Sequence, residues 1–185
     1  MNLGQIIDEI NKDLDDEIDN AELIGWINRC MDDLSPIVKY QKSAIISKVI
    51  GQKEYSLPSD YMRVVQLVDG MNPMNEIPLR DTQSEGYKVW GNKLILQPTP
   101  TTTGNLDLYY EGKLPHLVNP DDEPQIPSPF HDLFILYTVA KRQYQDEEEN
   151  MQMNAWSGFQ SRKGELIAFY RKTKIIPIQD VYRYE

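Results

Sequence analysis

Side chains that could carry out chemistry are scarce in this sequence, which contains two histidines and one cysteine. Neither His116 nor His131 has a partner at the spacing of a metal site such as HExxH or a CxxC pair. His131 follows Phe130 at the predicted start of a helix, a position typical of a packing or hydrogen-bonding residue. Cys30 lies on the apolar stripe of another predicted helix, which indicates a buried and unreactive thiol.

The acidic group Asp121, Asp122 and Glu123 is the remaining candidate for a site, because three carboxylates could bind a cation. An EF-hand loop needs alternating oxygen ligands around a glycine and a terminal glutamate, and this segment lacks them. No GxxxxGK[ST] or GxGxxG phosphate-binding loop occurs in the chain. The sequence therefore predicts no catalytic residue, no metal site and no cofactor, and we expect that the protein is not an enzyme.

Length and composition limit the possible classes of protein. A chain of 185 residues fits one domain, or one compact domain with a substantial insertion, and should bury roughly 70% of its unfolded surface. The net charge of -10 argues against coating nucleic acid with a basic surface. The single cysteine permits no intrachain disulfide. No basic signal segment or membrane-spanning run is found, so we expect a soluble protein made in the cytoplasm.

Charge is distributed unevenly along the chain. Residues 1–33 contain ten acids and two bases, whereas from Arg162 onward bases exceed acids. One interpretation is a solvated acidic face at one end, with bases that complement a helix C-terminus at the other. The alternative is that the two ends face different partners.

Apolar periodicity predicts helices at the start of the chain. The stripe that predicts the first helix recurs at steps of three and four residues, as on one face of an amphipathic helix; its members are Leu3, Ile6, Ile7, Ile10 and Leu14. A second stripe follows Asp19 or Asn20, either of which can cap a helix; its members are Leu23, Ile24, Ile27, Cys30, Met31 and Leu34. Pro36 is expected to end or kink this helix.

Between residues 43 and 112 the apolar period changes to two, which predicts a small antiparallel sheet. The runs AIISKVI and VVQLV are rich in β-branched residues and precede turn signals at Gly51 and at Asp69-Gly70. Gly91-Asn92 separates two apolar runs and matches a two-residue hairpin. The segment NLDLYYEG alternates strictly, which puts Leu106, Leu108 and Tyr110 on one face.

Two further helices follow a proline-rich strap at residues 121–129. Ser128 is predicted to cap a helix with Pro129 at its first position. The predicted core stripe of this helix is Phe130, Leu133, Phe134, Tyr137 and Tyr144. After a loop at 146–150, the last helix should bury Trp156, Phe159, Leu166, Phe169 and Tyr170. Gly158 and Gly164 suit close packing against a neighbour. The strap is interpreted as a structural joint between the sheet and the helices, not as a reaction centre.

The predicted fold class is therefore α+β, mainly α. A helical bundle of two N-terminal and two C-terminal helices carries an inserted antiparallel β-domain. The expected boundaries are 1–42 for the first helices, 43–120 for the β-domain, 121–173 for the last helices and 174–185 for an extended C-terminal tail. Pro177 forbids continuation of the last helix into this tail. The tail is nonetheless apolar, since it contains Ile175, Ile176, Ile178, Val181, Tyr182 and Tyr184.

Several phrases, in this order, resemble the head-to-tail adaptor proteins of tailed bacteriophages, also called head completion or connector proteins. They are EYSLPSDYMRV at 54–64, GNKLILQPTP at 91–100, LDLYYEGKLP at 106–115 and IPSPFHDLFILYTVAKRQY at 126–144. The later AWSGFQSRKGELIAFYRK is similar to the family's final helix, so that the resemblance spans residues 3–172. The two glycines of the last helix and the tail beyond Lys174 depart from the family pattern.

The resemblance implies a structural virion protein in the neck, between capsid and tail. Many copies, twelve by analogy, would form a ring on the portal protein, extend the DNA channel and present a platform for the next neck or tail component. Double-stranded DNA would pass through without being held, and no membrane would be involved. Another neck or tail ring component, a gatekeeper or stopper, is the alternative, with a small hydrolase or ligand-binding domain as a distant third.

Two sets of residues are candidates for contacts in such an assembly. Carboxylates repel a phosphate backbone, so the acids Asp13, Asp15, Asp16, Glu17 and Asp19 could line or flank the DNA passage; the alternative is a solvated outer face. The apolar tail could dock in a groove or add an edge strand on the portal or on a neighbouring copy. Alternatively, it folds back over its own sheet.

Overall fold

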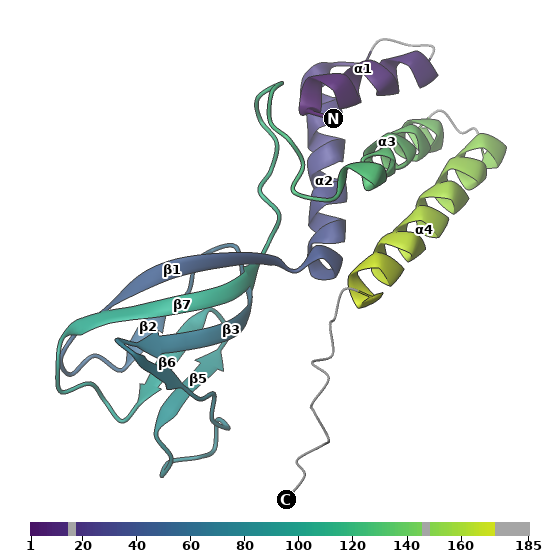
Figure 1. Cartoon of the computed structure of the whole chain (residues 1–185). Helices are drawn as coiled ribbons and strands as arrows, with labels where there is room; N and C mark the ends of the chain where they lie inside the picture. The colour runs from purple at the N-terminus through teal and green to yellow at the C-terminus, as the bar shows by residue number, and fades with distance from the viewer. Residues whose placement is uncertain (15–17, 146–148, 173–185) are drawn as a thin grey trace, which may run out of the picture. The chain divides into compact units, whose positions relative to one another are not determined.

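The computed structural model describes residues 1–14, 18–145 and 149–172 (Figure 1). These residues form four α-helices, one 3₁₀ turn and seven strands, which confirms the α+β class. The chain divides into two compact units. The helical unit comprises Met1–Val38 and the chain from Pro115 onward, and the β unit comprises Lys39–Leu114.

The N-terminal helices form as the apolar periodicity predicts. Helix α1 spans Leu3–Asp13 and α2 spans Asn20–Val38. The predicted stripe of α1 is buried from Leu3 to Ile10, whereas Leu14, the C-cap residue, is half-buried. Most members of the α2 stripe are buried. Helix α2 continues through Pro36 and ends two residues later. The helix passes into Lys39, which has a positive φ of 54°, the conformation that commonly terminates helices.

The first turn of α1 is held by two different kinds of acceptor. The Asn2 and Gln5 side chains form a capping box with the backbone N–H groups of Gln5 and Asn2. The backbone N–H groups of Leu3 and Gly4 donate instead to two carbonyls at the start of the strap, those of Asp122 and of the preceding Pro120, both at 2.8 Å. The strap therefore satisfies donors that a helix N-terminus cannot satisfy by itself.

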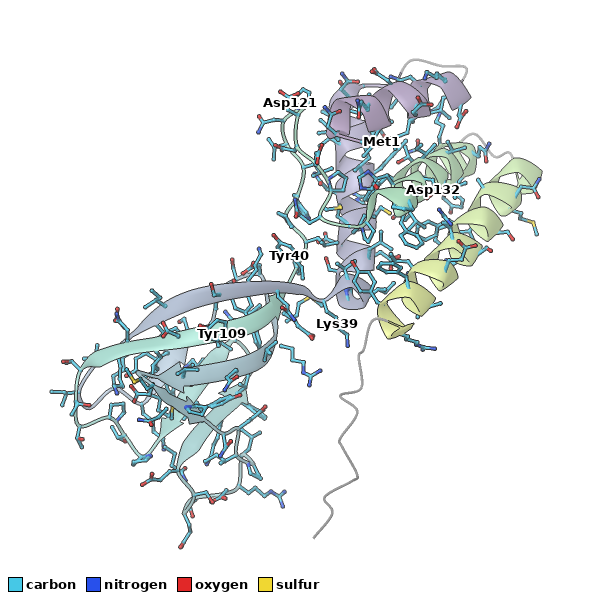
Figure 2. The ribbon with its side chains drawn as sticks, in the orientation of Figure 1. Met1, Lys39, Tyr40, Tyr109, Asp121 and Asp132 are labelled. Atoms are coloured by element: carbon cyan, nitrogen blue, oxygen red, sulfur yellow. The ribbon has the colours of Figure 1, made fainter. Side chains whose placement is uncertain are left out.

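Hydrogen bonds also connect the strap to residues 118–119 just before it and attach Leu117 to α2. The Asp122 carboxylate accepts from the N–H groups of Val118 and Asn119, both at 2.7 Å, and these bonds lower its pKa. On α2, the Asn28 side chain donates to the Leu117 carbonyl at 2.9 Å and accepts from the Leu117 N–H at 2.8 Å. Asp121 lies at the exposed bend (Figure 2). These bonds attach this segment to α1 and α2 within the helical unit.

The C-terminal helices begin later than predicted. Ser128 does not cap an α-helix: it starts a 3₁₀ turn, Ser128–Phe130, whose N-cap Pro127 makes no side-chain capping bond. Helix α3 then spans Asp132–Gln145 and α4 spans Glu149–Lys172. The fully buried side chains of these two helices include Phe134 of α3 and Phe159 of α4. Part of the predicted loop at 146–150 lies outside the described residues.

The predicted apolar stripes of α3 and α4 are only partly buried. Leu133, Phe134, Phe159 and Leu166 are buried, as expected. Phe130 is buried as well, but three other members of the stripes are exposed: Tyr144, Trp156 and Phe169. The prediction that these three lie in the core is wrong, because helical periodicity gives the direction of a side chain and not the extent of its neighbour.

Three glycines inside helices provide a test of stability. A Cβ at Gly158 would meet Leu136 at 3.4 Å, whereas Cβ atoms at Gly25 and Gly164 would meet nothing within 4 Å. The expectation of close packing is therefore confirmed at Gly158 and wrong at Gly164. Since alanine favours a helix interior over glycine by about 1 kcal/mol, Gly25→Ala and Gly164→Ala should each raise the free energy of unfolding by about that amount. Urea titration measures the gain, and Gly158→Ala, whose methyl group would make an ordinary van der Waals contact with Leu136, should gain at least as much.

The β unit consists of two antiparallel sheets. The first has the strand order β1-β7-β3-β4 and the second β2-β6-β5. The strand bounds are Tyr40–Lys48, Glu54–Ser56, Tyr61–Asp69, Asn72–Met74, Gly86–Trp90, Lys93–Gln97 and Gly104–Gly112 for β1 to β7. The predicted hairpin is confirmed, because Trp90 pairs with Lys93 across Gly91-Asn92 and Gly91 has a φ of 58°.

The core of the β unit lies on the face predicted from alternation. Leu106, Leu108 and Tyr110 of β7 are buried, and they pack in one cluster with Leu67 of β3 and Leu94 of β6. The intervening side chain of Tyr109 is exposed on the opposite face (Figure 2). A strand with period two thus presents one apolar face to the second sheet.

Strand β7 begins at Gly104 and ends at Gly112, and a lysine side chain of β1 lies beside each of these two glycines. Near Gly104, Lys48 reaches Asp69 of β3 with a distance of 2.5 Å between Nζ and Oδ2. Near Gly112, Lys42 reaches Asp60 at 2.6 Å. A side chain at Gly112 would meet the Tyr110 ring at 3.0 Å and Lys42 at 3.1 Å. The absence of a Cβ at Gly112 therefore leaves room for Lys42 to reach Asp60 across the end of β7.

Candidate partner-binding surfaces

The cysteine and the two histidines lie apart and serve the fold. Cys30 is fully buried on α2, and burial raises the pKa of its thiol well above the usual range. His116 contacts Asp32 of α2, with 3.1 Å between Nε2 and Oδ1. Within residues 1–14, 18–145 and 149–172, no group of three or more His, Cys, Asp or Glu side chains could hold a metal ion.

His131 is a buried hydrogen-bonding residue at the start of α3, as predicted. Its Nε2 lies 3.1 Å from the Ile126 carbonyl, and a carbonyl only accepts, so Nε2 carries the proton. Its Nδ1 lies 2.9 Å from the Met1 ammonium group and is therefore the acceptor. Burial lowers the pKa of His131, and the charge of the Met1 ammonium lowers it further.

The lowered pKa predicts a pH dependence of stability. In the unfolded chain His131 should titrate near 6.5, above its pKa in the folded state. The unfolded state then binds more protons between these two values, so stability is complete above pH 6.5 and falls as the pH drops toward the folded pKa. His131→Gln should flatten the decline in urea-derived stability between pH 7.5 and 5. His116→Gln, which changes an exposed ring, should retain it, and an unchanged slope in His131→Gln would contradict the assignment.

Some of the N-terminal acids are exposed to solvent, and another forms an ion pair with a distant part of the chain. Asp13 and Asp19, which flank the α1–α2 connection, are exposed; Asp15, Asp16 and Glu17 lie outside the described residues. Asp33, by contrast, accepts from Lys163 of α4 with 2.5 Å between Oδ2 and Nζ. The acidic stretch therefore also supplies a contact that joins α2 to α4.

Arg162 shows that the C-terminal bases serve the helical unit as well. Its Nε donates to the Asp132 carboxylate at 2.8 Å, and its other nitrogens donate to the Pro129 carbonyl and to Glu165. The guanidinium also lies 4.9 Å from the centre of the Phe130 ring, within the range of a cation–π contact. Neither interpretation of the uneven charge distribution predicted that Arg162 would join α4 to the beginning of α3.

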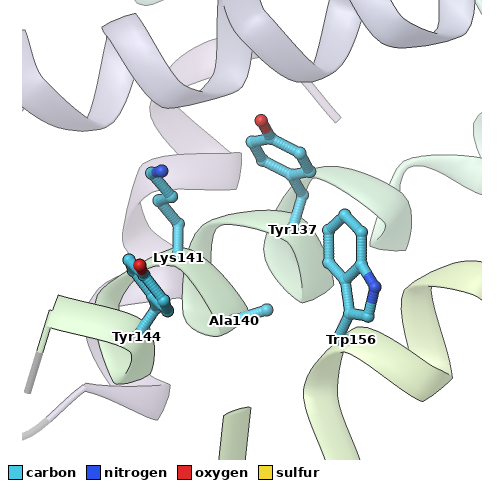
Figure 3. Close-up of a pocket in the computed structure, with 5 residues that line it drawn as sticks. All are labelled: Tyr137, Ala140, Lys141, Tyr144 and Trp156. Atoms are coloured by element: carbon cyan, nitrogen blue, oxygen red, sulfur yellow. The ribbon is translucent and has the colours of Figure 1, made fainter. Parts of the chain in front are cut away.

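An aromatic hollow of about 250 Å³ opens beside the C-terminal half of α3 (Figure 3). Four lining residues come from α3 at helical spacing and one from α4: Tyr137, Ala140, Lys141, Tyr144 and Trp156. Trp156 stacks on the buried Phe159 with ring centres 5.2 Å apart, and Tyr137 packs against both rings. Tyr144 and Trp156 remain 63% and 45% exposed. Sequence reasoning placed both in the core, so it missed this surface.

The β unit carries its own apolar surface on the outer face of β1-β7-β3. Tyr109 of β7 lies opposite Ser43 of β1 and Gln66 of β3. Ile45 of β1 and Val65, at a bulge in β3, are exposed beside it. Large apolar side chains exposed together on a sheet face are a feature of binding surfaces.

Comparison with known proteins assigns the chain to a family. A model of the SU10 adaptor protein family matches residues 1–176. The chain belongs to this family of phage head-to-tail adaptors. The resemblance noted in the sequence is thereby confirmed. No curated protein matches the chain.

Membership of the SU10 adaptor family makes the chain a structural adaptor of a bacteriophage, a class whose members interact with other head or tail proteins of the virion. The surfaces described above are therefore candidates for protein contacts. Among the described parts of this adaptor-family chain, no helix has both the length and the apolar character needed to cross a bilayer. The six apolar residues predicted to dock, from Ile175 to Tyr184, lie outside the described residues.

Proposed function

We propose that this chain is the neck adaptor that assembles as a ring on the phage portal. In that position it extends the DNA channel and forms the platform for the next neck or tail component. The match to the SU10 adaptor family over residues 1–176 carries the proposal. The exposed aromatic hollow of the helical unit and the exposed face of the β unit supply surfaces for contacts with neighbours.

Mixing the purified chain with the portal protein of its own phage tests this function. We expect a portal particle extended by an additional ring in electron micrographs, with the symmetry of that ring given by averaging. Twelve copies are expected by analogy with the family. Portal particles that retain none of the chain would contradict the proposal. A ring that binds only to preformed portal–adaptor particles would indicate a gatekeeper or stopper instead.

The C-terminal tail is proposed to make part of this assembly contact. Its apolar residues, Ile175, Ile176, Ile178, Val181, Tyr182 and Tyr184, would dock on the portal or on a neighbouring copy. An extended segment can gain main-chain hydrogen bonds while pockets take alternate side chains.

The acidic segment between α1 and α2 is proposed to face the DNA passage. Exchanging Asp13, Asp15, Asp16, Glu17 and Asp19 for lysine would convert repulsion of the phosphate backbone into attraction. We expect genome ejection from such virions to slow severalfold, as measured by the fluorescence of a dye that binds released DNA. Asp121→Lys with Glu123→Lys, at the exposed strap, is the matched control and should leave ejection unchanged. Equal ejection rates for all variants would support a solvated outer face instead.

A further inference from the structure

We propose that the aromatic hollow between α3 and α4 is the receptor for the C-terminal tail of a neighbouring copy. This inference rests on the proposed ring and names the surface that the tail recognises. It follows from the chemistry of the hollow, from the distance to the tail, and from the geometry of a ring.

The hollow has the composition of a site for apolar side chains. The rings of Tyr137, Tyr144 and Trp156 form its walls (Figure 3). Ala140 is buried between them, so its small side chain leaves space on this face of α3. Aromatic rings supply large contact area at a small cost in conformational entropy, which is why tryptophan and tyrosine are frequent in the centres of interfaces.

The tail has the matching composition. Within ten positions after Lys174 it contains three isoleucines, one valine and two tyrosines. Its Asp180 adds a carboxylate that could pair with Lys141, whose Nζ lies 5.7 Å from the centre of the Tyr144 ring. The tail also carries Lys174, Arg183 and Glu185, so its fit to the hollow rests on its apolar side chains, with Asp180 available to pair with Lys141.

Distance along α4 keeps the three isoleucines of the tail out of the hollow of their own chain. Trp156 and Lys172 are 16 positions apart on α4, which corresponds to about 24 Å at 1.5 Å per residue. A fully extended tail advances about 3.3 Å per residue, so its own Ile175, Ile176 and Ile178 fall short of the hollow. Residues from Asp180 onward could reach the hollow of their own chain, so a contact that includes the isoleucines requires the hollow of a neighbouring copy.

Ring geometry requires the same kind of contact. A closed ring is built from heterologous interfaces, in which one surface of each copy meets a different surface of the next. A tail at one end of α4 and a hollow near its other end are two such surfaces on one helix. In such a ring the tail of each copy binds the hollow of the next copy, and the last copy binds the first.

Photo-cross-linking in the assembled full-length ring tests the inference. Benzoylphenylalanine replaces Tyr182, and unlabelled and ¹⁵N-labelled copies are mixed before assembly on the portal. We expect cross-links between a tail of one isotope and residues 137–156 of the other. Cross-links confined to one isotope would overturn the assignment to a neighbour. Cross-links to portal protein alone would overturn the hollow as receptor while leaving the ring function intact. Failure of the unsubstituted chain to assemble would count against the proposed function itself.

Substitutions in the hollow give a second measurement. Tyr144→Ala and Trp156→Ala should each lower the yield of tail cross-links about tenfold or more, because both remove a central aromatic contact. Met153→Ala is the matched control, since Met153 is 68% exposed on the same helix but does not line the hollow. Tyr144 is largely exposed, so its removal should leave the melting temperature unchanged. An undiminished cross-link yield in Tyr144→Ala would overturn the inference.

Discussion

Removal of residues 174–185 is expected to abolish assembly onto the portal while the helical and β units stay folded. The deletion leaves every described helix and strand in place and eliminates all six apolar residues proposed to dock. Because the remaining surfaces would then have to hold the ring alone, we expect no portal-bound ring in micrographs at micromolar protein. Circular dichroism and a thermal melt should match those of the intact chain.

A matched variant separates the apolar contacts of the tail from its length. Exchanging Ile175, Ile176, Ile178, Val181, Tyr182 and Tyr184 for serine keeps twelve residues after Thr173 but removes the apolar side chains. It should fail to assemble, as the deletion does. Exchanging only Gln179 and Arg183 for serine should leave assembly intact. Normal rings from the deleted chain would refute the role of the tail, whatever surface receives it.

Gly86→Ala is expected to destabilise the β unit by about 3 kcal/mol or more. Gly86 begins β5 with a φ of 156°, and a Cβ there would lie 2.3 Å from the Asn75 carbonyl oxygen. That carbonyl accepts from the Tyr87 N–H at 3.0 Å, and the Tyr87 carbonyl accepts from the Ile77 N–H at 2.8 Å. The added methyl group must therefore displace backbone and break the bonds that attach residues 75–77 to the second sheet.

Gly91→Ala is the control, because Gly91 also has a positive φ, 58°, but faces open space. It should cost only about 1 kcal/mol, the penalty of the left-handed conformation. Hydrogen exchange measured by mass spectrometry reports the β unit separately from the helical unit. Faster exchange confined to the β unit of Gly86→Ala is expected. Equal exchange in the two variants would contradict the steric argument.

Local patterns predicted most of the secondary structure correctly. The stripe from Leu3 to Ile10, the alternation from Leu106 to Tyr110 and the Gly91-Asn92 turn all depend on residues close together in the chain. Such features follow from backbone geometry and from the side-chain periods of helices and strands. The sequence also correctly indicated that Cys30 is buried and that His131 is a hydrogen-bonding residue at the start of a helix.

Errors arose where a neighbouring element decides the outcome. Tyr144 and Trp156 have the spacing of core residues, yet the neighbouring helix does not cover them. Ser128 has the identity of a helix cap, but the chain adopts a 3₁₀ turn there and α3 begins at Asp132. In each case the prediction used the correct local rule without knowing the offset between packed elements.

The amino-acid sequence by itself determined the periods of the elements, the turn that joins β5 to β6, the family and the apolar character of the tail. Only the tertiary structure decided that Arg162 joins α4 to α3, that strap carbonyls complete the first turn of α1, and that an aromatic hollow remains open. The physical reason is the range of the interactions. Helix and strand periods arise between residues a few positions apart, whereas ion pairs, caps and hollows form between residues that folding brings together from distant parts of the chain.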